Sequence, residues 1–163
     1  MSAKTPIAIR RLSEPDAEAL WRFRLLALER EPQAFSEPVA QHRATPLTVF
    51  VDRLRSTENA VFGAFDGDLL IGMAGIYLQK SDTARVWGMF VQSEYRGAGI
   101  GRALLTSVLA HAQTLPDVTS VVLTVFPTQQ AARNLYLALG FRALDDQPED
   151  LTLRLKNQLP VAQ

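Results

Sequence analysis

The chain switches repeatedly between two hydrophobic periods, one typical of strands and one typical of helices. Residues 7–12 alternate apolar and polar side chains, which predicts a first strand. From Ser13 to about Arg30 the apolar positions share one helical stripe, with Ser13 in place to cap the helix. Residues 31–46 contain three prolines, so we expect an irregular loop there before a second helix over residues 47–55.

The middle of the chain has the strongest strand signals. Residues 60–65 and 69–78 are apolar runs joined by residues 66–68, whose Asp-Gly pair predicts a tight hairpin. Residues 83–91 form a third apolar run, as expected for a strand near the middle of a sheet. Residues 99–113 then return to the helical period.

The last third of the chain repeats this alternation. Residues 118–126 are rich in β-branched side chains and predict a strand. Thr128 is expected to cap a helix that ends at Leu139, with Gly140 at the position just after it. Two short closing strands are expected near residues 141–144 and 151–155.

The predicted order is strand, two helices, three strands, helix, strand, helix and two strands. Hairpins on both sides of a central strand–helix–strand unit indicate a mixed sheet with helices on both faces, in the α/β (α+β) class. The chain has 163 residues, and we expect residues 1–163 to form a single domain.

Composition narrows the chemistry. Lys and Arg together number 17, as do Asp and Glu, so nothing favours a nucleic acid or a membrane as a partner. The absence of cysteine excludes disulfides, thiolate catalysis and cysteine-bound metal. His42 and His111 lie far apart without a partner at metal-ligand spacing, so no metal site is predicted. No apolar run is typical of a signal peptide or long enough to span a bilayer, and we expect a cytoplasmic protein.

Residues 89–102 hold the most informative pattern. A strand ends at Val91, and Gly97, Gly99 and Gly101 then alternate into the start of a helix. Backbone N–H groups at a helix start are unpaired and partly positive, and glycine lets a phosphate approach them closely. On the glycines alone, a strand-to-helix turn without any ligand is the alternative.

Two familiar phosphate fingerprints do not match this turn. A Walker A loop ends in Gly-Lys-Ser/Thr, whereas residues 101–103 read Gly-Arg-Ala and offer no hydroxyl to Mg²⁺. A G-x-G-x-x-G dinucleotide fingerprint would need its third glycine at Arg102 or Leu104. A nucleotide-binding fold of either kind is therefore disfavoured.

The same segment resembles motif A of the GNAT N-acetyltransferase superfamily, Q/R-x-x-G-x-G/A, at Arg96, Gly99 and Gly101. A second block, residues 132–136 followed by 139–141, resembles motif B of that family. Two such blocks in the family's order are far more specific than either alone. The resemblance implies a GNAT fold with a mixed central sheet of about seven strands. It also implies an acetyl-CoA-dependent N-acetyltransferase that needs no metal.

The resemblance implies where acetyl-CoA would bind. Its pyrophosphate would lie on the turn that follows Arg96, formed by Gly97, Ala98, Gly99, Ile100, Gly101 and Arg102. The pantetheine arm would pair like an added strand with the backbone of Met89, Phe90 and Val91. Many relatives place an Asn that contacts CoA where this chain has Gln129, so we expect that contact to be reshaped or lost.

Two residues receive catalytic roles from the resemblance. In the family a bulge aims one N–H at the thioester carbonyl, and Met89, next to Gly88, is the matching position for this one-donor oxyanion hole. Tyr136 matches the general acid that protonates or holds the departing thiolate. A phenol with a pKa of ~10 carries its proton at neutral pH. Without the neighbouring motif, Tyr136 would be read as a core aromatic.

The sequence defines the acceptor site and the general base less closely than the acetyl-CoA site. The two usual positions for a base hold Arg85 and Thr124, so no usual base is present. We expect the loop over residues 31–46 to border the acceptor, with Glu37 and His42 as candidate contacts, although both fit ordinary solvated residues as well. The acceptor would be a small-molecule or peptide amine. A catalytically silent acyl-CoA-binding or sensor domain is the alternative, and the sequence leaves open a homodimer and acyl groups other than acetyl.

Overall fold

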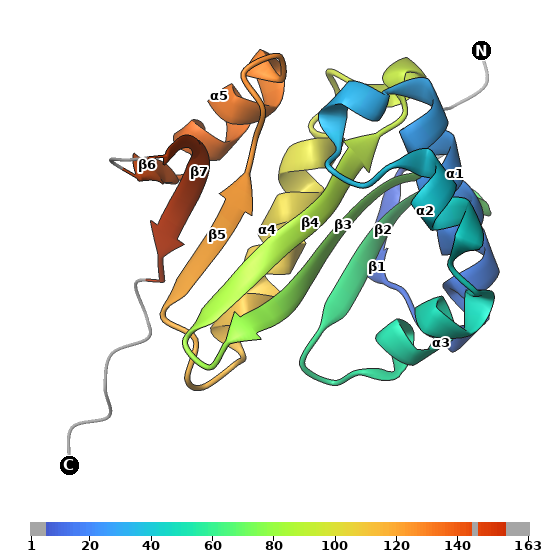
Figure 1. Ribbon diagram of the computed structural model, residues 1–163, viewed down its shortest axis with the longest axis horizontal. Coiled ribbons are helices and arrows are strands. Elements are labelled where there is room, and N and C mark those ends of the chain that lie inside the picture. The colour runs from blue at the N-terminus through green and yellow to red at the C-terminus, as the bar shows by residue number, and fades with distance from the viewer. Residues whose placement is uncertain (1–5, 145–146, 156–163) are drawn as a thin grey trace.

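The computed structural model describes residues 6–144 and 147–155. In this part of the chain seven strands form one sheet in the order β1-β2-β3-β4-β5-β7-β6 (Figure 1). The strands are β1 (Ala8–Arg11), β2 (Ala60–Asp66), β3 (Leu69–Lys80), β4 (Thr83–Val91), β5 (Ser120–Thr124), β6 (Arg142–Leu144) and β7 (Gln147–Arg154). Neighbouring strands are antiparallel except β4 and β5, which are parallel. The predicted mixed sheet is confirmed.

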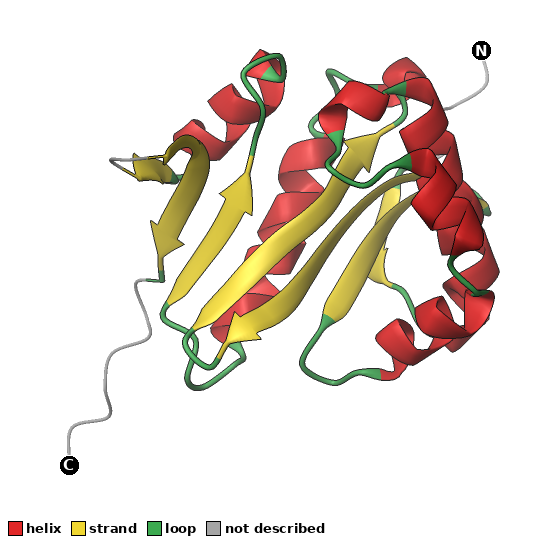
Figure 2. Cartoon of the chain, in the orientation of Figure 1, coloured by secondary structure: helices red, strands yellow, loops and turns green. Residues whose placement is uncertain are grey.

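Helices cover both faces of this sheet (Figure 2). The α-helices are α1 (Ala17–Arg30), α2 (Val39–Ala44), α3 (Leu47–Arg55), α4 (Ile100–Gln113) and α5 (Gln130–Ala138). Strand β2 shows why two layers form, because its alternate side chains enter different clusters. Ala60 and Ala64 pack in one cluster with α4, while Val61 and Phe65 pack in the other with α1 and α3.

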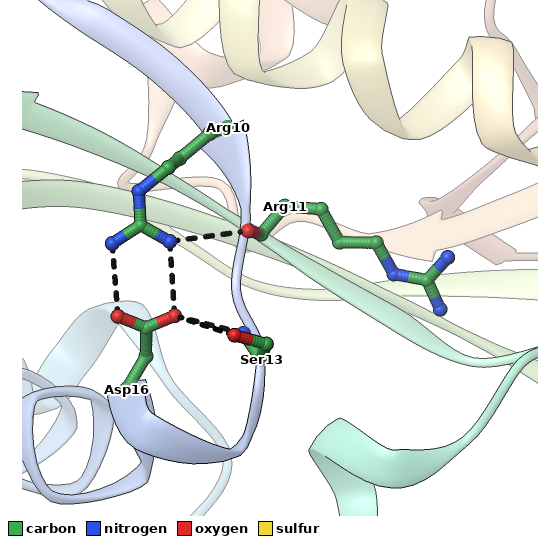
Figure 3. Close-up of polar contacts among 4 residues, drawn as sticks. All are labelled: Arg10, Arg11, Ser13 and Asp16. Atoms are coloured by element: carbon green, nitrogen blue, oxygen red, sulfur yellow. Dashed lines mark hydrogen bonds and ion pairs between the residues drawn. The ribbon is translucent and has the colours of Figure 1, made fainter.

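A set of hydrogen bonds to Asp16 precedes the first helix, and the sequence predicted it only in part. Ser13 precedes a short 3₁₀ turn (η1, Glu14–Asp16), and α1 itself starts at Ala17. The backbone N–H of Ser13 donates to Asp16 Oδ2 at 2.8 Å. Two 2.9 Å hydrogen bonds from Arg10 reach the same carboxylate (Figure 3). The hydrogen bonds from Arg10 lower the pKa of Asp16 and tie β1 to α1.

The expectation of an irregular loop over residues 31–46 was wrong for its second half. That half contains α2, and a 3₁₀ turn (η2, Pro32–Ala34) comes before it. The three prolines do not interrupt these elements, because each stands at a start: Pro32 opens η2, Pro38 is the N-cap of α2 and Pro46 the N-cap of α3. Proline is well tolerated there, since the first N–H groups of a helix lack intrahelical partners.

The end of α5 positions the motif B tyrosine. The helix begins after Gln129 rather than at Thr128, so the predicted cap was wrong, while Gly140 is confirmed just beyond the helix with φ +105°. Gly140 N–H donates to Leu137 O and Phe141 N–H to Tyr136 O, both at 3.1 Å. This is a Schellman motif, and its hydrophobic contact is the Tyr136 ring 5.9 Å from that of Phe141.

Strands β4 and β5 separate toward their carboxyl ends, and this separation opens the sheet. They pair only from Thr83–Ser120 to Arg85–Val122, and beyond that point the two ribbons diverge in Figure 1. In the same half of β4, Gly88 and Met89 lie opposite the single residue Ala74 of β3. Gly88 adopts φ +67°, and the predicted β-bulge is confirmed.

Candidate active site

A cavity of about 490 Å³ lies between the end of β4, the glycine-rich turn and α5. We call it the glycine-turn cavity. Ten of the predicted cofactor residues line it, from three segments: Met89, Phe90, Val91, Arg96, Gly97, Gly99, Ile100, Gly101, Arg102 and Gln129. Ala98, also predicted, is not among the lining residues. The segments that the resemblance singled out therefore meet around one space.

The turn itself has the geometry of an anion site. Gly97 and Gly99 have φ values of +84° and +82°, a left-handed conformation that glycine adopts without strain. Gly99 is the N-cap of α4, and its carbonyl accepts the first helical bond from Ala103 at 3.0 Å. The N–H groups in the first turn of α4 thus have no partner within the helix. A Cβ on Gly97 or Gly99 would meet no atom within 4 Å, so packing does not explain these glycines.

Arg96 braces this turn against the sheet. Its Nε donates to Val91 O at 2.8 Å, its guanidinium forms an ion pair with Glu31, and it lies 5.1 Å from the centre of the Phe90 ring. The side chain of Arg96 is therefore already engaged, although it also lines the glycine-turn cavity. We infer that it holds the turn in place as much as it supplies positive charge.

A smaller cavity of about 90 Å³ lies where β4 and β5 diverge, and we call it the splay cavity. It is lined by Val86–Met89, by Leu123–Phe126, and by residues of α5 and the loop before α2, among them Phe35. Met89, Gln129, Ala132 and Tyr136 line both this cavity and the glycine-turn cavity. The two spaces are therefore neighbours, and the bulge at Met89 lies between them.

Tyr136 combines a core position with access to both cavities. It is 5% exposed and belongs to the apolar cluster around α4, as expected for a core aromatic. Its hydroxyl has no hydrogen bond to any residue that the structure describes. Burial raises the pKa of the phenol, so Tyr136 keeps its proton throughout the neutral range. The phenol is therefore a hydrogen-bond donor at the edge of the splay cavity.

Arg85 and Thr124, which occupy the two usual base positions, are linked by hydrogen bonds to the carboxylate of Asp150, which the sequence did not suggest as a site residue. Arg85 Nη1 donates to Thr124 Oγ1 at 3.1 Å, and Thr124 Oγ1 donates to Asp150 Oδ1 at 2.7 Å. Asp150 is the pairing partner of Thr124 on β7. The predicted closing strand began one residue later, which left Asp150 in a loop. Because Thr124 lines the splay cavity, Asp150 is one hydrogen bond away from it.

Glu37 and His42, the two candidate acceptor contacts, lie in different surroundings. Glu37 lines a third cavity, of about 430 Å³, but Arg24 Nη2 donates to its Oε1 at 3.1 Å. His42 is fully buried, stacked on Trp21 at 5.0 Å with Nε2 2.9 Å from the carbonyl of Trp21. The structure therefore contradicts the prediction that His42 contacts an acceptor directly. Its link to the cavity is through Glu37, whose Oε1 lies 4.0 Å from His42 Nδ1.

The third cavity contains two arginines that sequence reasoning missed. We call it the arginine cavity, and its wall includes Arg24 of α1, Arg53 of α3 and Trp87 of β4. Charged helical residues are usually solvated, so neither arginine was predicted as a site residue. One signal was available for Arg24, because it follows Leu20 by four positions and precedes Ala27 by three on the apolar stripe of α1.

Comparison with known proteins decides the family. The family model for the acetyltransferase (GNAT) family matches residues 22–141. The chain belongs to this family. Among curated relatives, N-acetyltransferase 8F1 of Rattus norvegicus is 28% identical over 115 residues, which cover 68% of this chain and 52% of that protein. Spermine/spermidine N(1)-acetyltransferase of Bacillus subtilis (strain 168) is 27% identical over 84 residues, 48% of this chain and 55% of that protein. The chain thus spans about half the length of these relatives.

Solved GNAT structures share the fold at low sequence identity. The PaiA N-acetyltransferase of Thermoplasma acidophilum, in complex with coenzyme A, aligns with a TM-score of 0.70 and 19% identity, covering 91% of this chain and 98% of that one. A GNAT acetyltransferase of Streptococcus pneumoniae aligns with a TM-score of 0.72 and 19% identity, covering 92% and 100%. The GNAT fold implied by motifs A and B is confirmed.

The described residues contain neither a cluster of metal ligands nor a membrane-spanning helix. Within residues 6–144 and 147–155, no group of three or more His, Cys, Asp or Glu side chains is arranged to hold a metal ion. Within the same residues, no helix has the length and apolar character required to cross a bilayer.

Proposed function

We propose that this GNAT protein is an acetyl-CoA-dependent N-acetyltransferase that transfers an acetyl group to a primary amine by direct attack on the thioester. The observation that carries the proposal is that Met89 and Tyr136 line both the glycine-turn cavity and the splay cavity. A thioester at the junction would lie beside the β4 bulge on one side and a neutral phenol on the other. Similar structures solved with coenzyme A, from Thermoplasma acidophilum, or with acetyl-CoA, from Salmonella typhimurium, support the donor.

The residues of the site would have separate roles in binding acetyl-CoA and in the reaction. The first turn of α4 would hold the pyrophosphate through backbone N–H groups, and the backbone of Met89 to Val91 would bind the pantetheine arm. Met89 N–H would stabilise negative charge on the acetyl oxygen. The amine nitrogen bonds to the acetyl carbon, the C–S bond breaks with its electron pair on sulfur, and Tyr136 donates a proton to that sulfur. One proton from the acceptor ammonium leaves to solvent, and Tyr136 recovers its own from the attacking amine.

A silent acyl-CoA-binding domain is the second candidate, because Arg85 and Thr124 occupy the usual base positions. Steady-state release of CoA thiol over a panel of amines separates the two. The chain has no cysteine, so a thiol reagent reports released CoA without background from the protein. Amine-dependent thiol release supports the enzyme. Tight acetyl-CoA binding with no release above the uncatalysed rate over the whole panel would establish the silent domain instead.

Binding of acetyl-CoA and CoA is expected to need no metal, because the lining residues of the glycine-turn cavity offer arginines and the start of α4 to a phosphate but no carboxylate to a metal ion. Ligand at ~100 times its dissociation constant should stabilise the fold by about 2.7 kcal/mol. Calorimetry and thermal unfolding in EDTA, repeated with Mg²⁺, measure this. Absence of binding, or binding that appears only with Mg²⁺, would contradict the prediction.

The reaction with an alkylamine acceptor is expected to accelerate with pH. An alkylammonium keeps its proton up to about pH 10.4, and only the free amine attacks the thioester. With Arg85 and Thr124 at the base positions, log kcat/KM should rise with a slope near one through about pH 8 to 9. A profile that levels off near pH 6 to 7 would reveal a tuned base. The substitution Asp150→Asn would then identify it, since His42 is held by Trp21 away from the cavity.

A further inference from the structure

The arginine cavity carries more positive than negative charge. Among its lining residues the ionised side chains at neutral pH are Arg24, Arg53 and Glu37, which sum to one net positive charge. Glu37 is committed to Arg24 Nη2 at 3.1 Å. The remaining wall is mostly apolar or aromatic, with Val61, Ile76, Tyr77 and Trp87. A cavity of about 430 Å³ with apolar walls and a few fixed polar groups has the size of a small-molecule site.

Arg24 has a buried hydrogen-bond donor that the protein leaves unused. Its side chain is 9% exposed, and its Nη1 has no hydrogen-bond partner among the residues that the structure describes. Burial, and after it the positive charge of Arg53, lower the pKa of Arg24 against the opposing effect of Glu37. A buried charged donor without a partner is costly, and native proteins rarely keep one without a reason. An anion that enters the cavity and reaches Nη1 would supply the missing acceptor atom.

Arg53 is available for the same anion. It forms no ion pair with a described residue, and its guanidinium lies over two rings, 5.3 Å from Trp87 and 4.9 Å from Phe50. Arg55, two residues along the same helix, differs, because its Nε donates to Glu14 at 2.5 Å and it does not line the cavity. Two like charges from α1 and α3 thus line one cavity whose lining residues include a single carboxylate, that of Glu37.

The arginine cavity adjoins the site where the thioester would react. Trp87 lines both the arginine cavity and the splay cavity. An ideal Cβ on Gly88, the first residue of the bulge, would lie 3.4 Å from Arg24 Nη1. Arg24 Nη1 therefore lies near Gly88, in the bulge that also contains Met89. A molecule in the arginine cavity could extend past Trp87 to the splay cavity.

We propose that the acceptor is an amino-carboxylic acid whose carboxylate binds Arg24 and Arg53 while its amine reaches the thioester. This inference rests on the proposed acetyltransferase function and names its substrate class. Arginine binds a planar carboxylate through parallel N–H bonds, and the apolar wall suits an apolar side chain on the acceptor. A polyamine would instead bring a second ammonium against two arginines, an unfavourable like-charge contact. The acceptor class therefore differs from the one named for the Bacillus subtilis relative.

Matched acceptors test the carboxylate. The twenty amino acids are screened with acetyl-CoA, and the best is compared with its own primary amide and with spermidine. Loss of a hydrogen-bonded charge predicts that kcat/KM falls by roughly 10- to 100-fold from the acid to the amide. The amide holds its ammonium proton less tightly, so amine reactivity alone would favour the amide. Equal or higher kcat/KM for the amide or for spermidine would overturn the inference and leave the acetyltransferase function intact.

Substitution of Arg53 tests the site. R53Q should raise the KM for the amino acid about tenfold or more and leave the KM for acetyl-CoA unchanged. R53E should lower the ratio of kcat/KM for the amino acid over that for spermidine still further, because it reverses the charge. R55Q, on the same helix but outside the cavity, is the matched control. An effect of R53Q no larger than that of R55Q would overturn the assignment.

A binding experiment separates this inference from the function itself. Calorimetry with CoA present compares the N-acetyl derivatives of the screened amino acids with their amides, which needs no turnover. Preference for the acids that R53Q abolishes supports the carboxylate site even if no amine is acetylated, and in that case only the proposed function fails. Equal binding of acids and amides, or binding of neither, overturns the inference.

Discussion

Replacing Tyr136 with phenylalanine is expected to lower kcat for acetyl transfer at least about tenfold, and general acid catalysis is typically worth ~10²- to 10⁴-fold. The KM for acetyl-CoA should change much less, because the hydroxyl acts on a thiolate that develops only as the C–S bond breaks. The ring would still pack against Phe141 and remain within the Schellman motif. Steady-state kinetics together with calorimetry of acetyl-CoA measure the two effects separately.

The pH dependence of Tyr136 adds a second test. Burial raises the pKa of its phenol above the ordinary ~10, so the acid form persists across the accessible range. The deficit of Y136F should therefore stay constant from about pH 6 to 9 rather than vanish at high pH. An unchanged thermal midpoint is the control for the fold. If kcat of the folded variant equals that of the wild type, Tyr136 is a packing residue only.

The fold was largely predictable because most of its elements carry strong local signals. The strand over residues 83–91 and the helix over residues 47–55 have the bounds that their hydrophobic periods predicted. The error over residues 39–44 came from reading prolines as breaks, when Pro38 instead begins the helix. Periodicity shows where an element lies, but a proline marks either its start or its interruption, and only the packed structure decides between them.

The sequence predicted the residues of the glycine-turn cavity but not the arginines of the arginine cavity. The glycine-turn cavity is lined mainly by residues 89–102, which are close together in the chain, and every cofactor residue that the resemblance implied lines it except Ala98. The arginine cavity depends on Arg24 and Arg53, which meet only because α1 and α3 pack on the same face of the sheet. His42 failed as a candidate for the related reason that Trp21, distant in sequence, covers it.

The Gly99→Asp variant is expected to bind CoA roughly 10³-fold more weakly than Gly99→Asn. Gly99 is left-handed at φ +82°, and Asn and Asp both tolerate that conformation, so the two variants share the backbone cost and differ in charge. A Cβ at this position meets no protein atom, so both variants should fold. A unit charge about 4 Å from a phosphate charge at an effective dielectric of about 20 costs about 4 kcal/mol, and each 1.4 kcal/mol corresponds to about tenfold in affinity.

Ionic strength and a second glycine complete the test of Gly99. The difference between the Asp and Asn variants should shrink as salt rises, because the Debye length falls from ~10 Å at 0.1 M to ~3 Å at 1 M. Gly67→Asn is the conformational control, since Gly67 also has positive φ, at +60°, with open space around a Cβ, but lies in the β2–β3 hairpin. It should cost similar folding stability and leave CoA affinity unchanged. A folded Gly99→Asp protein with the affinity of the Asn variant would show that the phosphates bind away from the start of α4.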